Sequence, residues 1–234
     1  METTNTEPTD PRWKLLYQLG GAAALSMVSI IVIQLIAFMT APPPYNGTAL
    51  DWFDLFQKNK LIGLIDFELL MVVYTILAIP LTLALYFALR GTDQALMALF
   101  FALSLVGTMC FIAARPAFEM LYLSNQFAAA TTEAQKALSL AAGETKLATF
   151  HGTAFQVSYF LGSINGLIVS LVMLKSRIFS RATAYVRIAS SVFDFGLLVP
   201  VIGIFLSIFS VLFLFAWNIM VARRLFQLAR SSAS

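Results

Sequence analysis

Residues 15–41 read LLYQLGGAAALSMVSIIVIQLIAFMTA, an apolar run that contains no charged side chain. A helix needs roughly 20 apolar residues to cross the ~30 Å hydrocarbon layer of a bilayer, so this run is long enough to span one. A surface helix of a soluble protein would carry a polar stripe, which this run lacks. The stretch therefore predicts a membrane-spanning helix.

Five further apolar stretches follow along the chain, near residues 61–89, 95–114, 153–174, 182–199 and 203–222. The chain is 59% hydrophobic and 12% charged, whereas globular domains average roughly 45–50% and 25%. The sequence predicts an all-α, polytopic transmembrane bundle of six spans, with the lipid bilayer as its main partner. We expect one domain over 15–230, flanked by tails at 1–14 and 231–234.

Basic residues predict the orientation of this bundle. If the N-terminus lies in the cytoplasm, ten of the 15 Lys and Arg residues fall on the cytoplasmic side. Because this excess follows the positive-inside rule, we expect both termini to be cytoplasmic. The net charge of +3 results from this topology and does not indicate nucleic-acid binding.

The segment 116–150 is the largest connection on the predicted outer side. It is rich in Ala, Glu and Lys, which favour helix, and Thr132 with Gln135 has the pattern of a capping box. Gly143 indicates a break before the helix that leads into span four. We predict a helical cap over the outer face, between spans three and four.

A few ionisable side chains lie inside or at the ends of the predicted spans. A charge at the bilayer centre costs about 2.5–3.5 kcal/mol even on a lenient scale, so charges that lie there are usually paired or functional. Counting residues along each span places six of them in the outer half: Asp66, Glu68, Arg115, Glu119, His151 and Asp194. We take all of these except Glu119 as candidate ligand-binding residues of an outward-facing polar pocket, roofed by the segment 116–150.

Helical angles limit how these side chains combine. Asp66 and Glu68 are two positions apart, about 200° around a continuous helix, so they cannot both face one pocket. Arg187, Ser191 and Asp194 recur at i, i+4 and i+7, which predicts a polar stripe that faces the bundle interior. Two interpretations stay open at this point: static ion pairs between helices, or a site for a small ligand or ion.

The single histidine, His151, restricts the cofactor chemistry. Bis-His haem, multi-His iron and three-His zinc sites all need more histidines, and neither a Walker A nor a dinucleotide-binding motif is present. We expect no cofactor, no resident metal and no catalytic residue. A carboxylate-rich metal site with His151 as its one nitrogen ligand is the remaining alternative.

Small residues indicate where helices approach each other. Gly162 and Gly166 form a GxxxG pair in span four. Such a pair lets two helix backbones come close, which predicts packing within the protein. The alternative is contact with a second copy of the chain or with a partner membrane protein.

Short motifs in the second half of the chain have an order and spacing typical of one family. They are FAAATTEAQK at 127–136, AAGE at 141–144, HGTAFQVSY at 151–159, VMLKS at 172–176, FSRATAYV at 179–186 and ARRLFQL at 222–228. Over roughly residues 60–229 the chain resembles the uncharacterised bacterial and archaeal membrane proteins grouped as domain of unknown function 4386. The resemblance implies a multi-span bundle in the plasma membrane, with no established activity and no catalytic residues to carry over.

The sequence thus predicts an integral membrane protein that does not catalyse a reaction. We expect it to bind or move a small or amphiphilic ligand at the polar pocket. The alternatives are a structural or regulatory subunit of a membrane complex and an intramembrane enzyme, which would need convergent titratable groups within hydrogen-bond reach.

Overall fold

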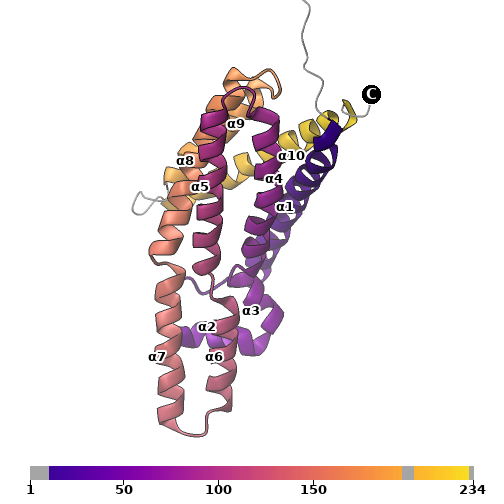
Figure 1. Cartoon of the computed structure of the whole chain (residues 1–234). Coiled ribbons are helices and arrows are strands. Elements are labelled where there is room, and N and C mark those ends of the chain that lie inside the picture. The colour runs from indigo at the N-terminus through magenta and orange to yellow at the C-terminus, as the bar shows by residue number, and fades with distance from the viewer. Residues whose placement is uncertain (1–10, 197–202, 232–234) are drawn as a thin grey trace, which may run out of the picture. The chain divides into compact units, whose positions relative to one another are not determined.

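The computed structural model describes residues 11–196 and 203–231, and every regular element in these ranges is helical (Figure 1). A short 3-10 helix, Pro11–Trp13, comes first. The α-helices follow in this order: α1 Lys14–Thr40, α2 Ala49–Lys58, α3 Lys60–Asp66, α4 Leu69–Leu89, α5 Gln94–Ala113, α6 Ala117–Ala129, α7 Glu133–Phe150, α8 Thr153–Lys175, α9 Arg181–Phe195 and α10 Gly203–Ser231.

Several of these helices have the length and composition to cross a membrane. The described residues contain five such segments: Lys14–Thr40, Leu69–Leu89, Gln94–Ala129, Glu133–Lys175 and Phe209–Ser231. The predicted span at 182–199 corresponds to α9, which has 15 described residues, and its positions 197–199 lie outside the described residues. An all-helical protein with five candidate spans is therefore what the structure shows.

The predicted span at 61–89 is not one helix. It consists of α3 and α4, which are separated by Phe67 and Glu68. The prediction of a continuous span was wrong at this point because Glu68 adopts a φ of 61°, which a right-handed helix cannot contain. α4 itself runs without interruption through Pro80.

The chain divides into two compact units, each assembled from segments far apart in sequence. Unit 1 comprises Met1–Val28, Leu77–Leu105 and Leu161–Ser234, and unit 2 comprises Ser29–Ile76 and Val106–Phe160. Four long helices, α1, α4, α5 and α8, contribute one part to each unit.

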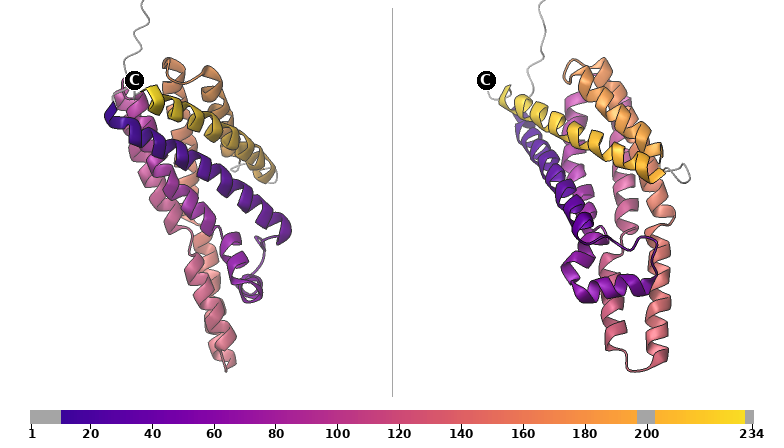
Figure 2. Two further views of the ribbon diagram at one scale, coloured as in Figure 1. Left: turned by 90° about the vertical axis from the view of Figure 1, so that its right-hand side faces the viewer. Right: turned by 180° about the vertical axis from the view of Figure 1, so that it is seen from behind.

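Unit 1 contains close helix packing at small residues. A Cβ atom added to Gly20 of α1 would lie 2.5 Å from the Cβ of Ala84 in α4, so only glycine allows this approach. In the same unit, α9 and α10 pack as a pair (Figure 2). Ser191 of the predicted polar stripe on α9 is fully buried, and so is its neighbour Ser190.

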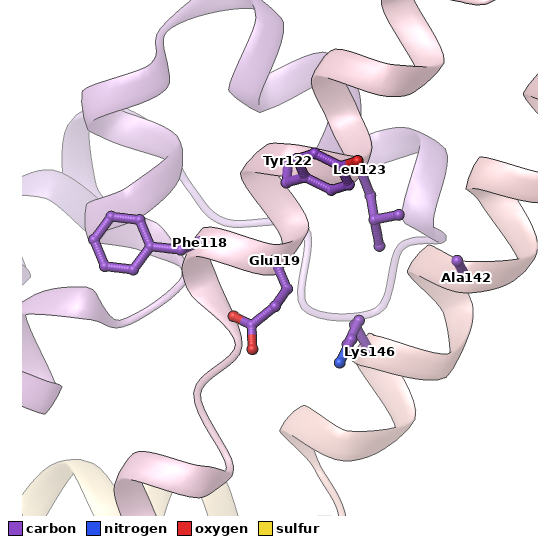
Figure 3. A pocket seen from close by; sticks show the side chains of 6 residues that line it. All are labelled: Phe118, Glu119, Tyr122, Leu123, Ala142 and Lys146. Atoms are coloured by element: carbon purple, nitrogen blue, oxygen red, sulfur yellow. The ribbon is translucent and has the colours of Figure 1, made fainter.

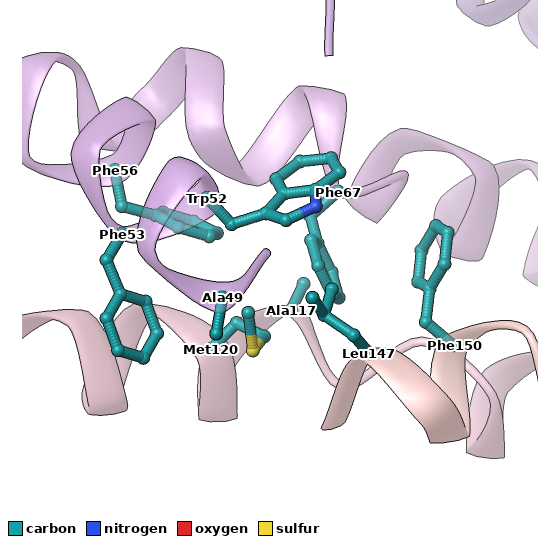
Figure 4. Packing of buried hydrophobic residues seen from close by; sticks show 9 residues of the cluster. All are labelled: Ala49, Trp52, Phe53, Phe56, Phe67, Ala117, Met120, Leu147 and Phe150. Carbon is teal, nitrogen blue, oxygen red and sulfur yellow. The ribbon is translucent and has the colours of Figure 1, made fainter. Parts of the chain in front are cut away.

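Unit 2 contains a helical hairpin, α6 and α7, with α2 packed against both of its helices (Figure 1). The segment 116–150 is therefore helical, as predicted, and Thr132 begins α7 in a capping box with Gln135. Aromatic side chains dominate the core between these elements (Figure 4). Its buried members are Ala49, Trp52, Phe53, Phe56, Phe67, Ala117, Met120, Leu147 and Phe150.

The predicted break at Gly143 was wrong. α7 runs through Gly143 and ends at Phe150, one residue before His151. A Cβ at Gly143 would come within 2.8 Å of both Ala49 and Phe53, so this glycine allows α2 to approach α7 and does not end the helix.

The two glycines of the GxxxG pair differ in their surroundings, which yields a direct test. A Cβ at Gly166 would lie 2.7 Å from Arg187 Cζ and closer still to Ser191 Oγ, whereas a Cβ at Gly162 would meet nothing within 4 Å. We expect Gly166→Ala to lower the stability of the detergent-solubilised protein by about 1–3 kcal/mol, because the Ser191 hydroxyl and the Arg187 guanidinium of α9 must be displaced. Thermal unfolding of both variants measures this.

Gly162→Ala is the matched control, since it lies one turn away on the same helix. Its stability should stay equal to the wild type or rise slightly, because alanine favours helix by about 1 kcal/mol over glycine. Equal unfolding temperatures for the two variants would contradict the packing of α9 on Gly166.

Candidate functional site

The break between α3 and α4 is the feature that arranges the candidate site in unit 2. Asn59 begins α3 by accepting hydrogen bonds from the N–H groups of Leu61 and Ile62. At the other end Phe67 is fully buried in the aromatic core, and the Glu68 N–H donates to Ile65 O at 2.9 Å. Glu68 thereby takes the left-handed position that glycine usually occupies after a helix. This reversal gives the Asp66 and Glu68 side chains separate surroundings.

Glu68 forms an ion pair with Arg115. Arg115 Nε donates to Glu68 Oε2 at 2.8 Å, and the exposed fractions of the two side chains are 2% and 18%. The hydroxyl of Tyr45, in the connection from α1 to α2, donates to Glu68 Oε1 at 3.3 Å. Burial, and next the charge of Glu68, raises the pKa of Tyr45, so this phenol stays neutral and remains a donor.

Arg115 has further partners within unit 2. Its Nη1 donates to the carbonyl of Phe150 at 3.1 Å and to that of Ala114 at 3.3 Å. Its Cζ lies 4.2–4.6 Å from the ring centroids of Phe111, Phe150 and Phe155. We call Arg115, with Tyr45, Glu68 and these three phenylalanines, the Arg115 cluster.

The Arg115 cluster connects helix junctions. Glu68 lies between α3 and α4, Arg115 between α5 and α6, and Phe150 at the end of α7. Because a guanidinium is planar and carries five N–H donors, one side chain can bond a carboxylate and carbonyls while stacking on rings. The ionisable residues were interpreted either as static ion pairs or as a ligand site. Glu68 and Arg115 form a static ion pair.

Asp66 has a different environment. Its side chain is fully buried, and neither carboxylate oxygen has a hydrogen-bond partner among the described residues. Desolvation raises the pKa of Asp66 to about 6. A buried carboxylate without a partner is costly, so such groups usually bind a proton, a cation or a ligand.

Gln34 of α1 lies beside the end of α3. Its Nε2 donates to Ile65 O at 3.0 Å, the carbonyl that precedes Asp66 in the chain. Its Oε1 is buried and has no partner in the described part of the chain. Sequence reasoning missed Gln34 and Tyr45, although Gln34 is a polar residue deep in the charge-free run 15–41 and could have been identified from that signal.

The two remaining candidate residues lie elsewhere. His151 directly follows α7, is exposed, and packs edge-on against Phe150 with ring centroids 4.9 Å apart. Asp194 belongs to unit 1, where it pairs with Arg187 Nη1 at 3.9 Å and accepts a hydrogen bond from Ser210. Arg187 also lies 5.3 Å from the ring centroid of Trp217.

An open groove lies on the α6–α7 hairpin (Figure 3). Its volume is about 400 Å³. The residues that line it are Phe118, Glu119, Tyr122, Leu123, Ala142 and Lys146. It is distinct from the Arg115 cluster and its walls are mainly apolar.

The described ranges, 11–196 and 203–231, contain no group of three or more His, Cys, Asp or Glu side chains that could hold a metal ion. A carboxylate-rich metal centre around His151, one of the alternatives from the sequence, therefore has no ligand set there.

Known proteins supply no assignment for these residues. No protein-family model, curated protein or solved structure matches the chain. The resemblance based on the short motifs stands as a proposal.

Removal of the Arg115 charge tests the Arg115 cluster. We expect Arg115→Met to lower the free energy of unfolding by about 3–5 kcal/mol, because Glu68 would remain as an unpaired charge in a mostly buried site. Denaturant or thermal unfolding of the protein in detergent micelles measures the loss.

Lys136→Met is the matched control, because Lys136 pairs with Glu133 at 3.0 Å on the exposed start of α7. Loss of such an exposed pair costs at most about 1 kcal/mol. If Arg115→Met proved as mild as Lys136→Met, the cluster would not stabilise unit 2.

The raised pKa of Asp66 predicts a pH dependence of stability. Because the pKa is 3.8 in the unfolded chain and about 6 in the folded one, the folded state holds the proton more tightly. The resulting stabilisation is complete below pH 3.8 and is lost as the pH rises through about 6, a fall of about 3 kcal/mol. The measurement is the stability of wild type minus that of Asp66→Asn between pH 4 and 8. A flat difference would show that the Asp66 pKa is not raised.

Proposed function

We propose that this chain is a multi-pass protein of the prokaryotic plasma membrane that binds or moves a small or amphiphilic ligand and does not catalyse a reaction. Five helical segments with the length and composition of membrane spans support the membrane assignment. Membership of the family named domain of unknown function 4386 forms part of the same proposal.

The proposed topology has six spans with both termini in the cytoplasm. The span predicted at 182–199 lies between α8 and α10 in the chain, and the α6–α7 hairpin forms the cap on the outer side. The excess of Lys and Arg on the assigned cytoplasmic side supports this orientation.

Asp66 is the single observation that carries the binding function. Its two oxygens are fully buried and have no partner among the described residues, although the same unit contains the cation Arg115. A residue that served the fold alone would be paired, as Glu68 is. An unpaired buried carboxylate at a helix break is typical of ion and substrate sites in membrane proteins.

The pairing of Glu68 with Arg115 favours binding over catalysis. A catalytic site needs titratable groups that converge on a space a substrate can enter. Glu68 and Arg115 are directed at each other, and Arg115 is further enclosed by aromatic rings. Asp66 is thus a single reactive group, which suits binding.

A subunit that packs on another membrane protein is the second candidate function. The α6–α7 groove favours it, because Phe118 and Tyr122 are 62% and 61% exposed there. Exposed aromatic side chains are enriched at protein interfaces. The GxxxG pair contributes less, since Gly166 already packs against α9.

The stability of Asp66→Asn tests the binding function. A binding residue that lacks its ligand destabilises the fold, so a neutral side chain of the same shape should raise stability by about 1–2 kcal/mol. The measurement is thermal unfolding in detergent at pH 8 in choline chloride without sodium or potassium, where Asp66 is ionised.

Glu119→Gln is the control, since it removes a carboxylate that lines the α6–α7 groove. Its unfolding temperature should equal that of the wild type. A loss of stability in Asp66→Asn as large as in Arg115→Met would mean that Asp66 supports the fold, and the proposed function would be withdrawn.

A further inference from the structure

Three buried side-chain oxygen atoms of α1 and α3 have no hydrogen-bond donor in the described part of unit 2. They are Asp66 Oδ1, Asp66 Oδ2 and Gln34 Oε1. Asp66 is fully buried and Gln34 is 5% exposed. The hydrogen bond from Gln34 Nε2 to Ile65 O holds the Gln34 amide at the end of α3, against the carbonyl of the residue that precedes Asp66.

All three atoms are acceptors. An ionised carboxylate is an acceptor only. The amide nitrogen of Gln34 directs one of its two N–H groups to Ile65 O, and neither of them bonds Asp66. A species that completes this corner must therefore supply positive charge or hydrogen-bond donors.

The Arg115 cluster leaves no positive charge over for Asp66. Glu68 and Arg115 neutralise each other at 2.8 Å, and Tyr45 stays uncharged. Asp66 is then left with one uncompensated negative charge in a buried position. One positive charge balances it.

The type of ligand atom indicates which cation fits. Carboxylate and amide oxygens suit hard cations, and the C-terminal end of a helix carries partial negative charge. Asp66 is the last residue of α3, directly before the break. Sodium sites of membrane transporters use the same combination of a broken helix and oxygen ligands. A divalent ion would need more carboxylates than the described residues bring together here.

We infer that Asp66 and Gln34 bind one small monovalent cation. This inference rests on the proposed function, and sodium is the cation with which we test it. The cation satisfies the three acceptor atoms and neutralises Asp66. Because Phe67 adjoins Asp66 and its ring packs on Trp52 with centroids 4.8 Å apart, the indole reports on this corner.

The experiment uses the full-length protein in detergent at pH 8, with choline chloride replaced stepwise by sodium or potassium chloride at constant ionic strength. We expect the unfolding temperature to rise by about 4–8 °C, in step with the logarithm of the sodium or potassium concentration once this exceeds the Kd. A variant that keeps Trp52 as its only tryptophan (Trp13→Phe and Trp217→Phe) should show a saturable fluorescence change in the folded protein, and the midpoint of that change gives the Kd.

Three variants complete the test. Asp66→Asn and Gln34→Leu should each lose the rise, whereas Glu119→Gln should keep it. Because Gln34→Leu leaves the Asp66 carboxylate in place, it tests the site even if Asp66→Asn folds poorly.

The outcomes separate this inference from the function on which it rests. A rise of equal size in Asp66→Asn would mark a bulk salt effect and overturn the cation site. Stabilisation by acid alone, with no response to either salt at pH 8, would mean that Asp66 takes a proton and would also overturn it. In both cases a higher stability of Asp66→Asn in choline chloride would leave the proposed binding function standing. A loss of stability in Asp66→Asn as large as in Arg115→Met would instead overturn the proposed function as well.

Discussion

The buried guanidinium of Arg115 is the interaction on which the arrangement of unit 2 depends. Arg115 itself lies between α5 and α6. It bonds Glu68 between α3 and α4, and it bonds the carbonyl of Phe150 at the end of α7. In a medium of low dielectric constant an unpaired charge and an unpaired carbonyl are both costly. One planar cation with several donors removes both costs, so the junctions are held in one geometry.

The left-handed Glu68 shows how this constraint reaches the candidate site. A non-glycine residue with positive φ is uncommon and has to be stabilised by its surroundings. Here the side chain of Glu68 binds Arg115 and accepts from Tyr45. The same break ends α3 at Asp66 and leaves that carboxylate buried without a partner in the described residues. The paired acid stabilises the fold, and the unpaired acid two residues earlier is the one for which we propose a ligand.

Predictions from local sequence were confirmed where one element decides the outcome. The capping box of Thr132 and Gln135 forms, because both residues belong to one helix start. The stripe of Ser191, Arg187 and Asp194 faces inward as its helical spacing predicts. Gly143 was misjudged because its role is the approach of α2, which lies far away in the sequence.

Hydrophobicity by itself determined that this chain is helical and has segments able to cross a membrane, because an apolar backbone in lipid must satisfy its hydrogen bonds within each segment. It also drew attention to Asp66 and Glu68, since charges are rare in such segments. Only the tertiary structure decided which acid is paired. The angle of 200° between them assumes a continuous helix, and the contact with Arg115, 47 residues further along the chain, is made across a break in that helix. A pairing of this kind depends on how distant helix ends meet, which no local pattern encodes.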